Sequence, residues 1–403
     1  MRHHDVVVIG GGSTGCSVLY HLAKMGVKGP LLVDMAPQLA AGQTSRSTAL
    51  VRTHYSTEIL TRMALISYGF FNDFGRELPG KSAGYVETGL LVGADEVSVR
   101  PLRQNSAMHK SLGIDSRVMR PDELAVSGIE PMLNADAFSL FAYEPHAGYA
   151  EQSTTASAFA SAAVELGAKI LTGTRANKVE RVPSFKAGGY SVSTTGGPVS
   201  CRIVVLATGV WSKPLFAELG VELPLKASRH PVAIFGRPPN FLGTRPVVFD
   251  FPRSAYYKPE GNELFFVGTL ARDIDTSGND ADPDAYDEGI TYEEAADFSR
   301  CASAAFPVMA ASGTYRRGYA GLYDNTPDQH PIIDELSERG FPGVYCVVGL
   351  SGHGFKLAPE FGRIVASLVT EGGFPDYDVS VFKLRRFEDG RLLGGRYGVS
   401  TIL

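Results

Sequence analysis

Three glycines near the start of the chain have the spacing of a phosphate-binding turn. Gly10, Gly12 and Gly15 follow the apolar run of residues 6–9, and residues 13–25 then place apolar side chains at helical spacing. In such a turn the first glycine permits the tight bend, the second lets the backbone approach a pyrophosphate, and the third lets helix and strand pack closely. The N-terminus of the helix, at Ser13, stabilises the negative charge. The pattern predicts a dinucleotide site.

An acidic residue stands where a bound dinucleotide needs one. Asp34 closes a second apolar run, residues 31–34, at the place where a carboxylate accepts hydrogen bonds from ribose hydroxyls. This first unit alone fits either NAD or FAD. Two later segments, residues 204–209 (VVLATG) and 349–355 (GLSGHGF), end or follow apolar strands with turns of small residues. Because a long flavin needs contacts from distant parts of the chain, these segments favour FAD.

Segments typical of a dinucleotide-binding fold occur at the start, middle and end of the chain, and β-rich segments lie between them. Residues 231–235, 246–251, 255–258 and 263–269 are short strand-like runs separated by turn signals, which suits an antiparallel sheet. We predict an α/β protein in which an interleaved Rossmann-like FAD-binding domain carries a second substrate domain built on a mixed, largely antiparallel β-sheet. We assign residues 1–84, 148–221 and 325–380 to the FAD-binding domain, 85–147 and 222–324 to the substrate domain, and 381–403 to a C-terminal extension.

The composition narrows the class of protein. The 403 residues carry a formal net charge of −5, which argues against a nucleic-acid partner because such a partner demands a basic face. The four cysteines lie far apart and form no CxxC pair, so no metal site is expected. No apolar run approaches the roughly 18 residues of a membrane span, and no signal-peptide pattern is present. We expect a cytoplasmic protein.

Longer segments resemble a known family. They are the glycine turn, the loop 44–52 (TSRSTALVR), and the segments 204–212 (VVLATGVWS), 321–334 (GLYDNTPDQHPIID) and 349–362 (GLSGHGFKLAPEFG). Through them nearly the whole chain resembles the D-amino-acid oxidase superfamily of FAD-dependent oxidoreductases, and within it the branch of sarcosine oxidase and dimethylglycine dehydrogenase. The resemblance implies an amine oxidoreductase that acts on CH–NH donors.

The resemblance also implies which residues form the site. It places Arg52 and Lys356 beside the flavin, where relatives use such a pair to hold the substrate carboxylate; an arginine fork clamps a carboxylate in a bidentate way, and a lysine adds a point charge. It places Tyr257 where relatives have an aromatic residue over the substrate. Structural roles for these three stay open, namely an ion pair with a structural acid, helix capping and core packing. The expected cofactor-binding residues are Gly10, Gly12, Ser13, Gly15, Asp34, Ser45, Thr48, Val179, Thr208, Gly209, Trp211, Gly349, Gly352, His353, Gly354, Phe355 and Lys356, with His353 expected to shape its loop rather than to titrate.

Two departures from the family pattern bear on the flavin. Relatives with covalent flavin carry a cysteine where this chain has Gly321, and some carry a histidine where it has Arg46. We therefore expect FAD to be held without a covalent bond. Oxidase members place a lysine over the flavin to activate oxygen, and residues 263–269 contain none. The electron acceptor is left open between O₂ and another carrier.

The expected reaction is oxidation of the C–N bond of a small secondary or tertiary amine that bears a carboxylate, an N-substituted glycine such as sarcosine, dimethylglycine or iminodiacetate. Hydride passes to flavin N5 and the imine then hydrolyses; the flavin carries the redox step, and the protein orients the substrate. Alternatives are a D-amino-acid or glycine oxidase, the flavin-carrying subunit of a hetero-oligomeric sarcosine oxidase, a subunit that keeps FAD without a substrate, and an NAD-linked dehydrogenase. Arg229, His230 and Arg317 are further candidates for holding a second carboxylate.

Overall fold

The first sheet is built around the glycine turn. In the computed structural model, which describes residues 3–182, 189–270 and 280–397, this sheet has the strand order β10-β11-β12-β1-β2-β9, with β19 beside β12 and β18 beside β19. Strands β12, β1, β2, β9 and β19 pair in parallel, whereas β10, β11 and β18 pair antiparallel with their neighbours. The strands are β1 His3–Ile9, β2 Leu31–Val33, β9 Lys169–Leu171, β10 Ala176–Arg181, β11 Tyr190–Thr194, β12 Val199–Leu206, β18 Ile332–Glu335 and β19 Val344–Val348.

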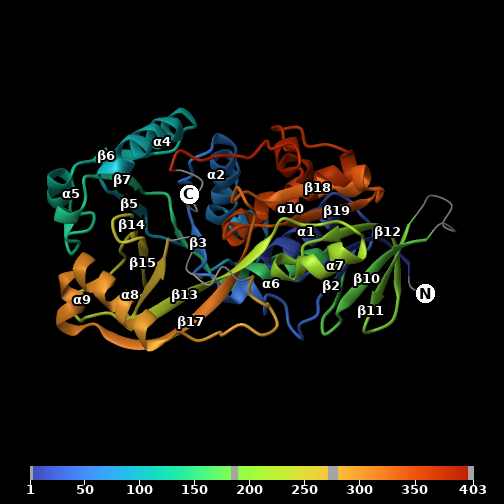
Figure 1. The fold of residues 1–403 in the computed structure, drawn as a ribbon, viewed down its shortest axis with the longest axis horizontal. Coiled ribbons are helices and arrows are strands. Elements are labelled where there is room, and N and C mark those ends of the chain that lie inside the picture. The colour runs from blue at the N-terminus through green and yellow to red at the C-terminus, as the bar shows by residue number, and fades with distance from the viewer. Residues whose placement is uncertain (1–2, 183–188, 271–279, 398–403) are drawn as a thin grey trace.

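Both faces of this sheet are covered, which explains why β1 reads as a continuous apolar run. Val6 and Val8 point into the core that the sheet shares with three helices packed together, α1, α6 and α10. Val7 and Ile9 point the opposite way, into a core that includes α7. Figure 1 shows these elements in the half of the molecule at the right. The helices of this half are α1 Ser13–Lys24, α2 Glu58–Asn72, α3 Phe74–Glu77, α6 Gln152–Glu165, α7 Ser212–Glu218 and α10 Gly354–Glu371.

The second sheet is antiparallel apart from one pair of strands. Its order is β17-β13-β16-β15-β14-β5-β7-β6, and only β14 and β5 run parallel among its described pairs. It forms the left half in Figure 1, with helices α8 and α9 packed near one edge. The strands are β5 Leu90–Ala94, β6 Arg117–Met119, β7 Leu140–Glu144, β13 Lys226–Gly236, β14 Val247–Asp250, β15 Ala255–Glu260, β16 Leu264–Thr269 and β17 Thr314–Asn325, and the helices are α4 Val99–Ser111, α5 Pro121–Ser127, α8 Tyr292–Ala305 and α9 Pro307–Ser312.

The chain passes between the two halves several times. A small sheet of β3 (Leu50–Val51), β8 (Gly148–Tyr149) and β4 (Val86–Glu87) lies where the chain passes between them. The predicted fold class, an interleaved α/β unit with a mixed and largely antiparallel second sheet, is confirmed. The domain bounds given above stay a prediction.

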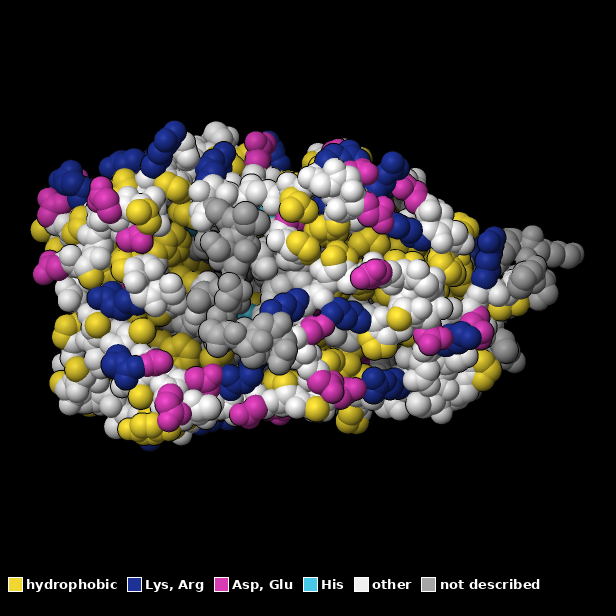
Figure 2. All heavy atoms as spheres, viewed as in Figure 1, with side chains coloured by type: hydrophobic (Ala, Val, Ile, Leu, Met, Phe, Trp, Pro, Cys, Tyr) yellow, Lys and Arg dark blue, Asp and Glu magenta, His cyan; other side chains and the backbone are white. Residues whose placement is uncertain are grey.

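On the face shown in Figure 2, basic and acidic side chains are interspersed, and neither kind forms a large patch. This agrees with the small net charge of −5. In the described part of the chain, no helix has the length and apolar character needed to cross a membrane.

Candidate active site

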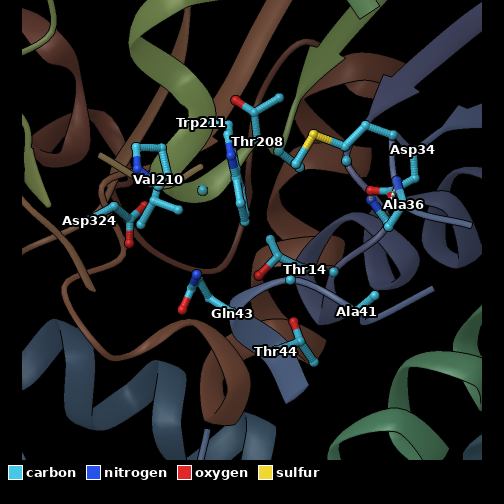
Figure 3. A pocket seen from close by; sticks show the side chains of 18 of the residues that line it. Thr14, Asp34, Ala36, Ala41, Gln43, Thr44, Thr208, Val210, Trp211 and Asp324 are labelled. Atoms are coloured by element: carbon cyan, nitrogen blue, oxygen red, sulfur yellow. Dashed lines mark hydrogen bonds between the residues drawn. The ribbon is translucent and has the colours of Figure 1, made fainter. Parts of the chain in front are cut away.

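A long cavity of about 490 Å³ runs along the edge of the first sheet where its parallel strands end, and its size suits a cofactor or ligand. Its wall is drawn from segments that are far apart in sequence. Figure 3 shows side chains from several of them converging on one space, among them Asp34, Thr208 and Asp324. The wall residues fall within the ranges 9–14, 33–36, 40–47, 174–177, 207–215, 283–288, 321–324 and 350–355.

The glycine turn brings the backbone close to this cavity. Gly10 has φ +116°, and a Cβ atom there would stand 2.2 Å from the carbonyl oxygen of Ala207. A Cβ atom on Gly15 would stand 1.9 Å from the carbonyl oxygen of Gly10, so the helix could not pack on the strand with any larger residue. Helix α1 begins at Ser13 without a side-chain cap at Gly12. The backbone N–H of Ser13 donates to the hydroxyl of Thr44 at 3.1 Å, and the other N–H groups of the first turn suit a pyrophosphate.

Asp34 forms part of the cavity wall in a fixed orientation (Figure 3). Its carboxylate accepts hydrogen bonds from the backbone N–H of Gly11, at 2.5 Å, and of Ala36, at 2.8 Å. A carboxylate held in this way at the end of β2 can accept hydrogen bonds from ribose hydroxyls. Together with the uncapped helix, it fits the nucleotide part of FAD.

Other predicted cofactor residues also line the cavity: Thr208, Gly209, Trp211, Gly352, Gly354 and Phe355. Trp211 is held by its indole N–H, which donates to Asp284 at 2.8 Å. Gly352 lies against the ring of Tyr323, where a Cβ atom would come within 2.6 Å of a ring carbon. Gly349 supports this loop from behind, because its backbone N–H donates to the carboxylate of Asp324 at 2.8 Å.

His353 has a fixed tautomer in the loop before α10. Its Nε2 lies 3.2 Å from the carbonyl oxygen of Gln329 and therefore donates, which leaves Nδ1 to accept from the hydroxyl of Tyr55 at 3.1 Å. Burial, and then the nearby Lys356 and Arg52, hold the pKa of His353 well below its usual range. The geometry matches the loop-shaping role expected for His353 and leaves it no free site for proton transfer.

Seven predicted cofactor residues do not line the cavity: Gly15, Ser45, Thr48, Val179, Gly349, His353 and Lys356. Val179 points into the core beneath the first sheet, because only the first residues of β10, such as Ala176, reach the cavity. Ser45 is exposed, and its hydroxyl donates to the carbonyl oxygen of Gly42 at 2.9 Å. Thr48 accepts from the hydroxyl of Tyr256 at 3.3 Å, on the side of the second sheet. The expected flavin contacts of Val179, Ser45 and Thr48 stay predictions.

Arg52 and Lys356 lie close enough to interact electrostatically, and neither lines the cavity. Both are buried, with exposed fractions of 4% and 8%. The guanidinium of Arg52 donates to the carbonyl oxygen of His54 and stacks on the ring of Tyr55 at 4.2 Å. The ammonium of Lys356 donates to the carbonyl oxygen of Gly352 at 2.9 Å. Burial and then the charge of Arg52 hold the pKa of Lys356 well below its usual range.

Tyr257 is fully buried between the second sheet and α8, and its hydroxyl donates to Asp250 at 2.9 Å and to the carbonyl oxygen of Cys301 at 3.0 Å. Its neighbour Tyr256 lies on the opposite face of β15, toward Thr48. Successive side chains of a strand point to opposite faces, so Tyr256 rather than Tyr257 faces Thr48. The expected substrate contact of Tyr257 stays a prediction. The side chain of Lys258 shares the face of Tyr256, and its ammonium donates to the carbonyl oxygen of Thr48 at 3.2 Å.

A buried polar network behind Arg52 was not foreseen from the sequence. Glu144, at the end of β7, accepts from the hydroxyl of Thr53 and from Nδ1 of His54, each at 2.9 Å. His109 of α4 places its Nδ1 at 2.9 Å from the same carboxylate oxygen as His54. The Nε2 of His109 donates to the carbonyl oxygen of Tyr55 at 2.8 Å, whereas its Nδ1 only lies near the carboxylate. The possible ligand atoms of His54, His109 and Glu144 lie within 4.8 Å of one another, as those of a metal site would. Burial opposes ionisation of Glu144, but His54 and His109 outweigh it and lower its pKa.

The three further candidates for holding a second carboxylate have different surroundings. Arg229 is engaged by Glu294 at 2.5 Å and by two backbone carbonyls. His230 is buried, stacks on Tyr323 with ring centres 3.7 Å apart, and burial lowers its pKa to about 3. Arg317 lies in the exposed first part of β17. A second carboxylate site is therefore not assembled from these three.

Comparison with known proteins identifies the family. A family model described as FAD dependent oxidoreductase (DAO) matches residues 5–368, so the chain belongs to this family. Monomeric sarcosine oxidase of Bacillus sp. (strain B-0618) is 27% identical over 395 residues, which cover 95% of this chain and 96% of the relative. Mitochondrial sarcosine dehydrogenase of Mus musculus is 26% identical, over 95% of this chain and 41% of the relative. Among solved structures, L-proline dehydrogenase from P. horikoshii has a TM-score of 0.85 and 27% identity, covering 97% of this chain and 100% of that chain.

The family and its cofactor follow from these findings. The prediction of an FAD-dependent amine oxidoreductase is confirmed at the level of the family, and FAD is its cofactor. The glycine turn, Asp34 and the loop at Gly352 fit the cofactor, since each presents the kind of group that a flavin dinucleotide needs.

Proposed function

We propose that the protein oxidises the C–N bond of a small secondary or tertiary amine that carries a carboxylate, with an N-substituted glycine as the substrate class. The names of the relatives support this class, since they include sarcosine oxidase and sarcosine dehydrogenase. Sarcosine is an N-methylglycine, and its carboxylate is the group that the protein must hold.

The observation that carries the proposal is the burial of two cations side by side. Each of Arg52 and Lys356 is almost inaccessible to water, and the charge of Arg52 disfavours protonation of Lys356. Within the described ranges, Lys356 forms no ion pair with a carboxylate. Burying cations together is costly unless an anion joins them. A substrate carboxylate would supply that anion at the end of the cavity.

The residues of the chain orient and enclose the substrate. Arg52 and Lys356 hold the carboxylate, while Tyr55, Phe249 and Tyr256 supply aromatic surface near Arg52 that limits water. Fixing the anion fixes the α-carbon and the N-alkyl carbon, which reduces the entropic barrier. FAD, held by the glycine turn and Asp34, would supply the acceptor for the hydride of the carbon atom next to nitrogen. The amine loses its N–H proton, if it has one, and water then hydrolyses the imine to a smaller amine and a carbonyl compound.

An anaerobic titration tests the proposal. The purified yellow protein is mixed with sarcosine, dimethylglycine and iminodiacetate, and the loss of flavin absorbance is followed. Arg52→Ala should raise the substrate KM by at least about a hundredfold while leaving the bound flavin spectrum intact, because a buried charged contact is lost. Arg300→Ala, which removes an exposed arginine of α8, is the control and should leave KM unchanged. An unchanged KM in Arg52→Ala would remove Arg52 from the site.

A cyclic amine is a second candidate substrate. L-Proline is also a carboxylate-bearing secondary amine, and the solved L-proline dehydrogenase shares 27% identity and a TM-score of 0.85 with this chain. Adding L-proline, glycine and D-alanine to the titration separates secondary amines from the primary amines of a D-amino-acid or glycine oxidase. Repeating it with O₂ and with an artificial dye identifies the acceptor, and gel filtration of the native protein tests for a partner subunit. A cytoplasmic location remains part of the proposal.

A further inference from the structure

The C-terminal segment crosses from one half of the molecule to the other. It is anchored on the first half, where Arg386 holds Asp328 by two hydrogen bonds and the backbone N–H of Leu393 donates to the same carboxylate at 3.1 Å. It then reaches the second half, where Arg396 donates to Asn105 of α4 at 3.1 Å. In Figure 1 the red segment passes from the right half toward β3 and α2. Arg396 and Tyr397 therefore lie beside the loop that carries Arg52.

Tyr397 is the residue of this segment that enters the site. Its hydroxyl lies 2.9 Å from Nε2 of His54, and its ring stacks on the imidazole with centres 5.9 Å apart at 22°. On its other side it meets Phe251 edge to face, with centres 5.0 Å apart. The imidazole of His54 already donates through Nδ1 to Glu144. Its Nε2 therefore accepts the proton of the Tyr397 hydroxyl when the ring is neutral.

His54 in turn fixes the peptide that holds Arg52. The backbone carbonyl of His54 accepts a hydrogen bond from the guanidinium, and the next residue, Tyr55, supplies the ring on which the guanidinium stacks. The imidazole of His54 is clamped between Glu144 on one nitrogen and Tyr397 on the other. Removing one clamp leaves a buried imidazole nitrogen without its partner and lets the 52–55 loop shift. A bidentate grip on a carboxylate depends on the plane of the guanidinium.

We propose that Tyr397, carried across the two halves by the C-terminal segment, is a positioning residue that orients Arg52 for the substrate carboxylate through His54. The inference rests on the proposed function, because it assigns the C-terminal segment to the same carboxylate site. It makes the C-terminal extension part of the substrate-binding apparatus.

The test compares Tyr397→Phe, which keeps the ring and removes the hydroxyl, with a chain that ends after Arg391. Acetate serves as a carboxylate that cannot be oxidised, and its binding is followed by the change in the visible spectrum of the bound flavin. Tyr397→Phe should weaken acetate binding and raise KM about tenfold with kcat nearly unchanged, as expected for a lost buried hydrogen-bond partner. The shortened chain should show a larger loss. Flavin content should stay at the wild-type level in both.

Tyr292→Phe is the matched control, since this tyrosine of α8 is 83% exposed and its change should leave acetate binding as it was. If Tyr397→Phe lowers the melting temperature but keeps the acetate Kd and KM within twofold of wild type, the residue is merely structural and the inference is overturned. If instead the wild-type enzyme binds acetate no better than Arg52→Ala does, the proposed function fails and the inference fails with it. If the shortened chain does not fold, Tyr397→Phe alone still tests the inference.

Discussion

Gly321 lies directly against Arg46 in the wall of the flavin cavity. A Cβ atom built on Gly321 would stand 2.8 Å from Cβ of Arg46 and 3.3 Å from the side-chain oxygen of Gln43. That oxygen accepts the backbone N–H of Leu322 at 2.6 Å, so it cannot easily withdraw. Both positions at which relatives carry a flavin-linked side chain therefore adjoin each other, and in this chain neither offers a nucleophile.

This contact predicts that FAD is held without a covalent bond. Precipitating the protein with acid should release all of the yellow colour into the supernatant, and the pellet should show no flavin fluorescence. Gly321→Cys alone should lower the flavin content of the purified protein, since its side chain has no room beside Arg46. A pellet that keeps its flavin after washing would contradict the prediction.

The two adjacent tyrosines of β15 should respond differently to loss of the hydroxyl group. Tyr257→Phe removes a donor to Asp250 and to the carbonyl oxygen of Cys301, so it should lower the free energy of unfolding by about 1–3 kcal/mol with KM unchanged. Tyr256→Phe loses only a long contact to Thr48 and should keep its stability, but change kcat/KM about fivefold. Urea unfolding and steady-state kinetics on the same preparations measure both. If Tyr256→Phe and Tyr257→Phe changed kcat/KM equally, the face of β15 that a tyrosine occupies would not determine whether it affects catalysis.

The parts of the site that sequence could predict are those encoded in a local pattern. Gly10, Gly15 and Asp34 sit in a strand–turn–helix–strand unit whose spacing alone implies a nucleotide site, and the cavity has them at its wall or just behind it. Tyr257 shows the limit of such patterns. The sequence marks the strand, but the face that each tyrosine occupies depends on how β15 pairs with β14 and β16, and a shift of one residue exchanges them.

The sequence could not predict the long-range contacts at His54. Glu144, His109 and Tyr397 meet at His54 from a strand, a helix and the C-terminal segment, at sequence separations of 90, 55 and 343 from His54. None of the three stands in a motif. Histidine is intermediate in burial among the residue types, so a histidine in the sequence does not by itself mark a site. Only the packing of the two halves shows that they converge behind Arg52.

The Glu144 network should make stability depend on pH in a defined direction. Because the pKa of Glu144 lies below its usual 4.5 in the folded protein, its contribution is fully present above about pH 4.5 and is lost as the pH falls below that value. Glu144→Gln removes the charge and should lower the free energy of unfolding by about 3 kcal/mol near neutral pH, as when a buried pair is broken. The gap between the variant and wild type should narrow below pH 4.5.

Thermal unfolding over that pH range measures the effect. Glu87→Gln is a suitable control, because Glu87 accepts hydrogen bonds from Tyr68 and His146 at the exposed surface. Its effect should be small at every pH, since exposed pairs contribute little. A constant gap between Glu144→Gln and wild type down to acid pH would show that Glu144 is not ionised in the folded protein.

Binding of the carboxylate should be linked to the uptake of one proton by Lys356. Burial and then the charge of Arg52 hold the pKa of Lys356 well below its usual range, and an anion beside the amine favours its charged form. Acetate affinity should therefore fall as the pH rises through the pKa of the complex, by up to about tenfold for each pH unit. Arg52 keeps its charge throughout because a guanidinium does not lose its proton in a protein, so Lys356→Met should bind acetate more weakly but without this slope. Calorimetry in two buffers of different ionisation enthalpy counts the proton directly. Wild-type affinity that is flat over this range would show that Lys356 is already charged before the substrate binds.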